Sequence, residues 1–314
     1  MSDDKEMHVV LGASGGAGEA LVRALAARGK RVRAASRSGR GDFPAGVERV
    51  KMEATDPASV REAARGAAVV YHCVNVPYPE WGEKLPGIME AVVAAGEAEG
   101  ARVVYADNLY MYGPTAGPMT EDTPVRPTTK KGAIRARLAE QLLGAHERGR
   151  VRAAIGRGSD FYGPGPLNAV AGERLFGAVR AGKKAMWVGR LDEPHSVTFI
   201  DDFARVLATL GERPEALGSV WHTPDAGALT GRELIEAAFR EAGKPPKAGT
   251  YSRTAIRLVG LFSPQMRELV EMMYQFEQPF VLDGSRFTRT FGDAATPHAE
   301  GIRRTLEWYR AKEG

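Results

Sequence analysis

The sequence predicts an α/β protein built around a doubly wound parallel sheet. Short apolar runs alternate with helical stretches through about the first 155 residues, as a parallel sheet with crossover helices requires. The first apolar run, at residues 8–11, ends at Gly12 and is typical of a strand covered on both faces. The next stretch, at 15–28, carries Ala17, Leu21 and Leu25 at helical spacing and ends at Gly29.

The same alternation continues along this half of the chain. Asp56 followed by Pro57 predicts a helix start, because aspartate caps free N–H groups and proline fits the first turn. We expect further strands at 31–35, 47–52, 67–74, 102–106 and 151–155, and helices from 56 and at 83–99 and 134–148.

The alternation ends at a glycine- and proline-rich stretch, residues 163–166. Beyond it, short extended pieces mix with helical patterns at 173–180, 203–210, 232–242 and 266–276. We therefore expect a first domain over 1–165 and a smaller second domain over 166–314, with 195–212 returning to the first.

Composition excludes several classes of protein. The formal net charge is +4, but arginines are scattered among acidic residues and no basic run carries interleaved aromatics, so we expect no nucleic-acid partner. Cys73 is the one cysteine, and no histidine or cysteine spacing predicts a metal site. No apolar stretch reaches membrane-spanning length, and residues 1–6 are too polar for a signal peptide. We expect a cytoplasmic protein without a membrane partner.

Three glycines, three residues apart, occupy the turn between the first strand and its helix. Gly12 permits unusual backbone angles, Gly15 lets N–H groups approach a pyrophosphate, and Gly18 lets the helix pack on the strand. The helix N-terminus then faces the anion. In this setting the spacing predicts a Rossmann-type dinucleotide-binding domain over 1–165, with Ser14 and Gly16 in the same loop. The alternative is a glycine-rich turn without a ligand.

The end of the second strand bears on the choice of cofactor. NAD-binding proteins usually carry a carboxylate there, whereas residues 35–40 contain Ser36 and two arginines, Arg37 and Arg40. A guanidinium is always charged and suits a 2′-phosphate, so NADP(H) is favoured and NAD(H) stays open. Alternatively, both arginines are solvated, or Arg37 stacks on adenine.

Six further motifs occur in a definite order. They are 53–56 (Glu-Ala-Thr-Asp), 75–77 (Asn-Val-Pro), Tyr112-Gly113, the stretch from Arg157 to Gly165, 197–202, and the stretch from Glu300 to Tyr309. Together they resemble the extended short-chain dehydrogenases/reductases, the NAD-dependent epimerase/dehydratase family, over nearly the whole chain. The resemblance implies cofactor contacts for Glu53, Ala54 and Asn75, and we expect Ala106, in the segment leaving the fifth strand, to join them. It makes the second domain the substrate-binding one.

The catalytic residues of that family are absent. The resemblance places its Ser or Thr at Asn108, and its Tyr and Lys at Gly132 and Ala136. None of the nine tyrosines has a lysine four residues on. Losing a positioned general acid costs on the order of 10²–10⁴-fold in rate, so another residue supplies the proton or the reaction needs none. Gly132 and Ala136 share a helix face, so we expect room for substrate there.

Replacement acids are expected after the fifth and sixth strands. If the segment after the fifth strand is extended, Asn108 and Tyr110 share a face, so Asn108 would polarise a carbonyl and Tyr110 would donate a proton. Alternatively, Asn108 caps a turn and Tyr110 only packs. Asp160, where the resemblance implies an asparagine that contacts substrate, is a third candidate, either as an acid or as a cap.

Substrate contacts are expected from residues in both halves. The candidates are Tyr78, Gly132, Tyr162 and His195. For His195 a structural hydrogen bond is the favoured alternative, because a lone histidine there is more often structural than catalytic. Tyr78 is equally compatible with a loop anchor. Lys130 and Lys131 are expected to be solvated, with a ribose contact as the alternative.

Three functions remain open, in this order. The first is an NADP(H)-dependent oxidoreductase acting on a carbonyl, an imine or a conjugated alkene of a small molecule. The second is an epimerase, dehydratase or lyase of non-redox outcome that retains its cofactor. The third is an inactive NADP(H)-sensing protein. The resemblance also implies a homodimer through helices 83–99 and 134–148.

Overall fold

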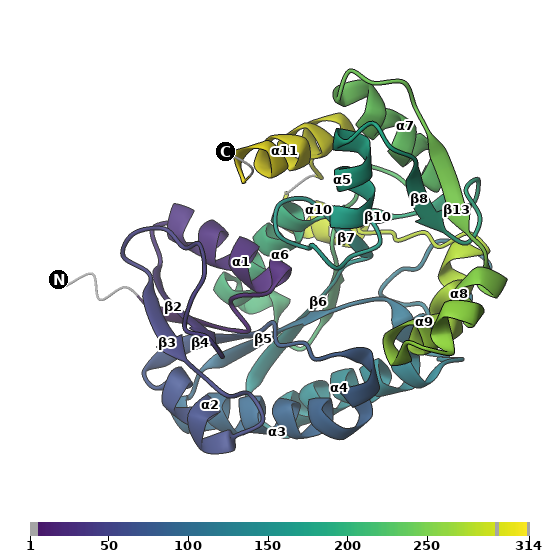
Figure 1. Cartoon of the computed structure of the whole chain (residues 1–314). Coiled ribbons are helices and arrows are strands. Elements are labelled where there is room, and N and C mark those ends of the chain that lie inside the picture. Colours follow the sequence, from purple (N-terminus) through teal and green to yellow (C-terminus); the bar gives the residue numbers. More distant parts are fainter. Residues whose placement is uncertain (1–5, 293–294, 313–314) are drawn as a thin grey trace. The chain divides into compact units, whose positions relative to one another are not determined.

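A computed structural model describes residues 6–292 and 295–312 (Figure 1). The polar segment that argues against a signal peptide, apart from Glu6, lies outside these residues. Residue contacts divide the chain into two compact units. Unit 1 holds the described residues up to 107, together with 134–157 and 203–221, and unit 2 holds 108–133, 158–202 and the described residues from 222 on.

The described part of unit 1 contains one sheet of seven strands in the order β11-β6-β5-β4-β1-β2-β3. The bounds are β1 Met7–Leu11, β2 Arg31–Ser36, β3 Glu48–Lys51, β4 Ala67–His72, β5 Arg102–Asp107, β6 Arg152–Arg157 and β11 Val220–His222. Every pairing from β6 to β3 is parallel. The predicted parallel sheet is therefore confirmed, and β1, which lies between β4 and β2, is buried at every residue, as its apolar pattern indicated.

Helices cover both faces of this sheet, which makes it doubly wound (Figure 1). They are α1 Gly16–Ala27, α2 Pro57–Ala64, α3 Trp81–Glu99, α4 Lys130–Glu147 and α6 Ile200–Glu212. Consecutive residues of β4 show the two faces. Tyr71 lies against Gly211 of α6, whereas His72 stacks on Tyr105 on the face that α3 and α4 cover.

Local sequence signals set the ends of these helices. Asp56 Oδ1 accepts a hydrogen bond from the Ala58 N–H at 3.0 Å, and Pro57 is the first residue of α2, as predicted. The helix α3 begins at Trp81, directly after the short 3₁₀ helix η1 Tyr78–Glu80, and ends at Gly100 in the left-handed conformation.

Unit 2 combines short strand pairs with helices around its own core. Its remaining elements are η2 Tyr110–Tyr112, β7 Asp160–Tyr162, α5 Glu173–Arg180, β8 Ala185–Val188, β9 Pro194–His195, β10 Val197–Phe199, β12 Leu229–Thr230, α7 Gly231–Glu241, β13 Ala248–Tyr251, α8 Arg253–Gly260, α9 Pro264–Met272, η4 Met273–Phe276, α10 Ser285–Phe291 and α11 His298–Ala311. Its core includes Phe176, Trp187, Phe239 and Leu306. The expected helix over 266–276 is two elements, because the chain tightens into η4 after Met272.

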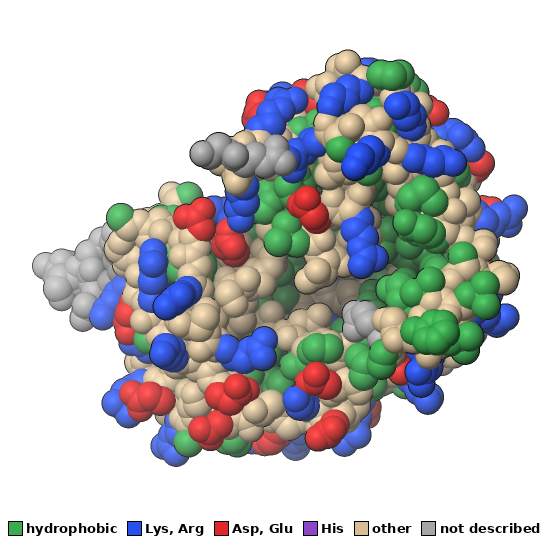
Figure 2. All heavy atoms as spheres, viewed as in Figure 1, with side chains coloured by type: hydrophobic (Ala, Val, Ile, Leu, Met, Phe, Trp, Pro, Cys, Tyr) green, Lys and Arg blue, Asp and Glu red, His purple; other side chains and the backbone are tan. Residues whose placement is uncertain are grey.

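Exposed apolar side chains gather on one part of unit 2. Among the described residues, Tyr251, Leu258, Val259, Leu261 and Phe262 are large, hydrophobic and exposed, and Phe262 is 91% accessible. They lie on or beside α8, where Figure 2 shows hydrophobic side chains at the surface. None of the helices that the structure describes is long and apolar enough to cross a lipid bilayer.

Candidate functional site

The glycine loop follows β1, and two of its glycines are required by the protein itself. Gly12 has φ +83°, and a Cβ there would lie 2.7 Å from the carbonyl carbon of Cys73. A Cβ on Gly18 would lie only 2.3 Å from the Gly12 carbonyl oxygen. A Cβ on Gly15 would make only an ordinary contact, 3.5 Å from the same oxygen. Internal packing therefore does not require a glycine at position 15. The absence of a side chain there leaves space for a bound group.

The start of α1 is not capped by a side chain, although the Gly15 N–H donates to the Gly12 carbonyl at 3.1 Å. Gly15 is its N-cap and supplies no side-chain hydrogen bond, and Ser14 and Gly15 are exposed. The Gly12 and Ala13 N–H groups donate to the Ala35 carbonyl at 2.9 and 3.0 Å, which holds the loop against β2. The loop residues therefore fit the pyrophosphate of a dinucleotide, because an uncapped helix N-terminus attracts an anion.

Residues at the ends of β2 and β3 border this loop on the same sheet edge. Ser36 is buried, whereas Arg37 and Glu53 are exposed. Glu53 accepts hydrogen bonds from the Thr55 N–H and hydroxyl, and these bonds, with the nearby Arg37 charge, lower the pKa of Glu53. Glu53 is therefore a carboxylate close to the Arg37 guanidinium. Ala54 is buried beside it.

The ends of β4 and β5 complete the edge in unit 1. Asn75 is exposed just beyond β4, and Ala106 is half-buried near the end of β5. Because all these strands are parallel, the predicted cofactor residues of unit 1 lie along one edge of the sheet. Tyr78 packs edge-on against Trp81, with 4.9 Å between ring centroids, and the Trp81 indole N–H donates to the Val76 carbonyl. This contact fits the loop-anchor interpretation of Tyr78.

A buried charge cluster beneath β5 was not predicted. Asp107 is fully buried, and its Oδ2 accepts a hydrogen bond from Arg157 Nε at 3.1 Å. Arg135 lies 3.6 Å from Asp107 Oδ1, and its guanidinium stacks 4.2 Å from the Trp81 ring centroid. Arg135 precedes Ala136, the position that the resemblance assigns to lysine. A buried cation therefore lies next to that position in the sequence. Of the residues in this cluster, only Arg157 belonged to a motif recognised in the sequence.

The segment after β5, in unit 2, is not extended. Leu109 has φ −107° and ψ 5°, and the chain then forms η2. Asn108 Oδ1 accepts a hydrogen bond from the Tyr110 N–H at 3.1 Å, so Asn108 caps this turn. The extended geometry from which we expected Asn108 and Tyr110 to share a face is therefore wrong. The asparagine amide selects a local turn instead.

Gly132 does not leave the space that we expected. A Cβ there would lie 2.5 Å from the Tyr110 carbonyl oxygen, 3.0 Å from Pro127 Cβ and 3.1 Å from Thr129 Oγ1. The backbone of η2 therefore already occupies the space that the Cβ of a tyrosine at this position would need. The expectation of a substrate space at Gly132 is therefore corrected, since the glycine permits close packing instead.

Gly132→Tyr is accordingly expected to destabilise the protein rather than restore a catalytic tyrosine. Overpacking of this kind costs about 1–3 kcal/mol, and urea unfolding of the full chain measures it. Ala133→Tyr is the matched control, because Ala133 is exposed on the same turn and should tolerate the ring. Equal stability of the two variants would contradict the packing interpretation.

Asp160 and His195 meet within unit 2. Asp160 begins β7 and His195 ends β9, and Asp160 Oδ2 lies 2.7 Å from His195 Nε2. The other ring nitrogen, Nδ1, lies 3.1 Å from the Gln275 carbonyl oxygen. The imidazole stacks on Phe276 at 4.9 Å and on Phe280 at 5.3 Å between centroids. Sequence reasoning named both residues but did not pair them.

Tyr162 belongs to the core of unit 2 instead of an open substrate surface. It is buried, its ring lies 5.3 Å from that of Phe199, and a Cβ on Gly301 would lie 2.4 Å from its hydroxyl. Burial raises the pKa of this hydroxyl. The motifs around 162, 197–202 and 300–309 thus include residues that pack on one another.

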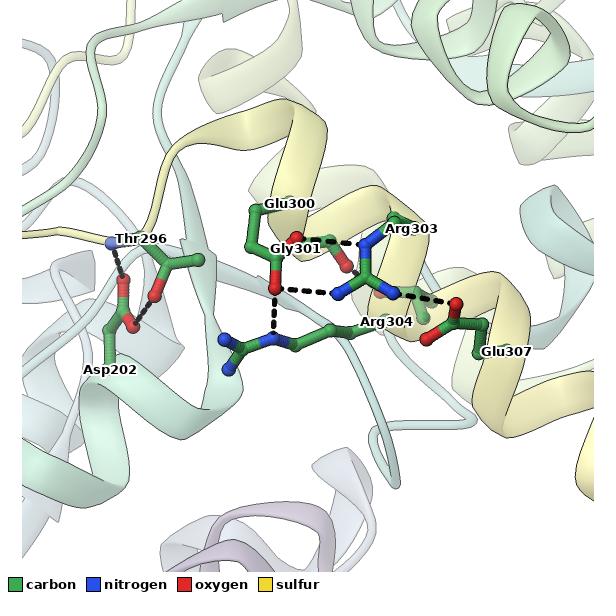
Figure 3. Close-up of polar contacts among 8 residues, drawn as sticks. Asp202, Thr296, Glu300, Gly301, Arg303, Arg304 and Glu307 are labelled. Carbon is green, nitrogen blue, oxygen red and sulfur yellow. Dashed lines mark hydrogen bonds and ion pairs between the residues drawn. The ribbon is translucent and has the colours of Figure 1, made fainter.

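Polar contacts hold the chain next to this core (Figure 3). The Asp202 carboxylate accepts from the Thr296 N–H at 2.7 Å and its hydroxyl at 2.6 Å, just before α11. Along α11, Glu300 pairs with Arg303 and Arg304, and these contacts lower the pKa of Glu300 to about 2. These motif residues therefore have a structural role.

Two further residues of unit 2 were missed or misplaced by sequence reasoning. Lys131 is buried and its ammonium pairs with Glu268 and Glu271 of α9, so the expected solvated lysine is wrong. The Tyr274 hydroxyl is buried and makes no hydrogen bond to a described residue. Burial first, and then the charge of Asp160, raise the pKa of Tyr274, which places it near that carboxylate. No local pattern signals either contact.

The fold and its glycine loop define a Rossmann-type α/β protein. The sequence profile of the NAD-dependent epimerase/dehydratase family matches residues 8–221, so the chain belongs to that family. A search of curated protein sequences returned no match.

Solved structures share this fold at low sequence identity. Thermus thermophilus UDP-glucose 4-epimerase, in complex with NAD, is 19% identical with a TM-score of 0.78, covering 97% of this chain and 99% of that one. Bacillus anthracis dTDP-glucose 4,6-dehydratase, with NAD, is 15% identical with a TM-score of 0.78, covering 98% and 97%. MoeE5, with UDP-glucose and NAD, is 22% identical with a TM-score of 0.76, covering 98% and 100%.

Proposed function

We propose that the protein is an NADP(H)-dependent oxidoreductase that acts on a carbonyl, imine or conjugated alkene of a small molecule. The observation that carries the proposal is the glycine loop. The packing of this loop does not require Gly15 to lack a side chain, and no side chain caps the N-terminus of α1. Family membership and the NAD named for three solved neighbours support a nicotinamide dinucleotide.

The residues of unit 1 have separate tasks in this proposal. Gly12, Ser14, Gly15, Gly16 and Gly18 form the pyrophosphate loop. The end of β2 and the Glu53-Ala54 pair would hold the adenosine half, and Asn75 and Ala106 the nicotinamide half. When bound, the nicotinamide supplies or accepts a hydride. The direct test is NADPH oxidation by the full chain with a panel of carbonyls, in which binding without turnover would favour a sensing protein instead.

Arg37 is proposed to select the 2′-phosphate. Arg37→Ala is expected to weaken NADPH binding on the order of 10- to 100-fold and to leave NADH binding unchanged, because only NADPH carries the extra anion. Calorimetric titration of both dinucleotides measures the two affinities. Arg61→Ala, an exposed arginine of α2, is the control for general charge loss. An equal loss for both dinucleotides would contradict phosphate recognition.

A reaction of non-redox outcome is the second candidate. Family membership favours it, because the family profile covers epimerases and dehydratases. Such an enzyme would retain its dinucleotide through a cycle and consume none overall. Dialysis of the purified protein followed by release of bound cofactor distinguishes the two. Retained dinucleotide without net consumption supports the second candidate, and stoichiometric NADPH consumption supports the first.

A further inference from the structure

The turn between α8 and α9 in unit 2 presents apolar side chains to water (Figure 2). It consists of Leu258, Val259, Leu261 and Phe262, whose exposed fractions run from 53% to 91%, and we call it the apolar turn. The N–H groups of Leu261 and Phe262 donate to the carbonyls three residues earlier, at 3.3 and 3.1 Å, so helical winding continues past the end of α8. Positions 258, 261 and 262 therefore lie three and four residues apart on one helical face.

The protein holds the apolar turn in place without packing its side chains. Ile256 and Gly260 are the buried residues of α8, on the side of the helix opposite Leu258. A Cβ on Gly260 would lie 3.2 Å from the backbone N and Cα of Arg267, so α8 and α9 approach closely along that buried side. The Ser263 hydroxyl caps the start of α9. The turn is therefore preformed, and its apolar side chains are left for a contact outside the fold.

The charge around the apolar turn is positive. Residues 242–267 contain no Asp or Glu, although the chain has 39 of them. The cations of this segment are Lys244, Lys247, Arg253, Arg257 and Arg267. Arg253 pairs with Glu277, with 2.9 Å between Nε and Oε1. Arg257 and Arg267 are exposed, and neither pairs with a carboxylate in the part of the chain that the structure describes. Two uncompensated guanidiniums thus flank an apolar surface.

An anionic lipid surface fits both properties of this patch. A side chain that is 91% exposed, as Phe262 is, projects from the surface and lines no groove. Projecting apolar side chains enter the boundary between headgroups and acyl chains, while arginines beside them reach lipid phosphates. A second copy of the chain fits less well, because a two-fold contact through this turn would bring the arginines of both copies together.

We propose that the apolar turn docks the protein reversibly on the surface of an anionic bilayer, with Arg257 and Arg267 against lipid phosphates. The contact lies within unit 2 and does not depend on the dinucleotide. The sequence expectation of no membrane partner considered only spanning segments and a signal peptide, and a contact at the bilayer surface needs neither.

Co-sedimentation of the full chain with lipid vesicles tests the contact. The wild type should bind vesicles of phosphatidylcholine with about one-third phosphatidylserine at least about tenfold more tightly than vesicles of phosphatidylcholine alone. Raising the salt from about 0.1 M to about 0.5 M should weaken this binding, because the guanidiniums are screened. Equal binding to both kinds of vesicle, or no binding to the anionic ones, would overturn the proposal.

Substitutions in the apolar turn test the apolar contribution. Leu261→Ser combined with Phe262→Ser should weaken binding to the anionic vesicles at least about tenfold, because less apolar surface enters the lipid. Both side chains are exposed, so urea unfolding should match the wild type. Leu167→Ser, which removes an exposed leucine just before α5, is the matched control and should bind normally. Undiminished binding of the double variant would show that charge alone attracts the protein, and would refute docking through the turn.

Arginine substitutions test the charge contribution. Arg257→Gln combined with Arg267→Gln should weaken binding to the anionic vesicles on the order of tenfold and leave the weak binding to phosphatidylcholine unchanged. Arg61→Gln, at an exposed arginine of α2, is the control for net charge and should bind almost as the wild type does. An equal loss in the two variants would mean that net charge, and not this patch, controls binding.

A fluorescent reporter locates the contact. Phe262→Trp, bound to anionic vesicles with brominated acyl chains, should lose emission relative to the wild type, whereas Leu167→Trp should not. Sedimentation velocity without lipid tests the second copy as the occupant. A wild-type dimer that Leu261→Ser with Phe262→Ser dissociates would assign the patch to self-association and overturn the lipid contact. A monomer in both cases, with quenching only at position 262, is the expected result.

Discussion

Gly18→Ala is expected to destabilise unit 1 and to abolish dinucleotide binding. Its Cβ would lie 2.3 Å from the Gly12 carbonyl oxygen and 2.8 Å from Ala13 Cα, both backbone atoms that cannot rotate away. The loop would have to separate from α1, at a cost of about 3 kcal/mol or more. Thermal and urea unfolding measure the loss, and dinucleotide titration at low temperature measures binding by the molecules that stay folded.

Gly15→Ala separates binding from folding in the same loop. Gly15 has φ −83° and its Cβ would make only a 3.5 Å contact, so stability should stay within about 0.5 kcal/mol of the wild type. The methyl group would occupy the approach to the α1 N-terminus, so NADPH affinity should fall at least about tenfold. Gly87→Ala, in open space on α3, controls for the loss of glycine flexibility and should bind normally. Wild-type affinity in Gly15→Ala would contradict the anion site.

Acidification below about pH 6.5 is expected to destabilise unit 1 through two buried histidines. Burial lowers the pKa of His8 to about 4 and that of His72 to about 3, with the Arg135 charge adding to the effect on His72. Both rings are neutral when folded and bind protons more readily when unfolded. Stability is therefore fully present above pH 6.5 and falls as the pH drops toward 4 and 3. At pH 4.5 each histidine costs about 2–3 kcal/mol.

Urea unfolding at a series of pH values measures this dependence. His72→Phe should keep the stack on Tyr105 and flatten the slope of stability against pH between 6.5 and 4.5 by about half. Tyr105→Phe is the control, because it keeps His72 and should keep the slope. A slope that His72→Phe leaves unchanged would show that other groups control the acid response.

The parallel sheet was predictable because its signals are local. Buried strands repeat as apolar runs, Asp56-Pro57 starts α2, and the glycines of the first loop have fixed structural tasks. The failure at Asn108 is also local. The Asn108 side chain accepts from the Tyr110 N–H where the chain turns into η2, and the hydrophobic pattern carries no sign of this bond.

The rest of the candidate site depends on contacts between distant residues. Asp160 and His195 are hydrogen-bonded although 35 positions separate them in the sequence. His195 and the Gln275 carbonyl are hydrogen-bonded across 80 positions. Arg135 and Asp107 come together only once α4 lies on β5. Such pairs have no spacing rule in the sequence, so residue types alone could suggest Asp160 and His195 but could not join them or find Tyr274.

The strand order of the sheet in unit 1 also has a consequence for folding during synthesis. Its edge strand β11 lies beside β6, yet more than sixty residues separate them, and 158–202 between them belongs to unit 2. A nascent chain that has just completed β6 therefore carries an open strand edge through the synthesis of that segment. Slowing translation between residues 158 and 220 should lengthen this exposure and increase aggregation of the emerging chain.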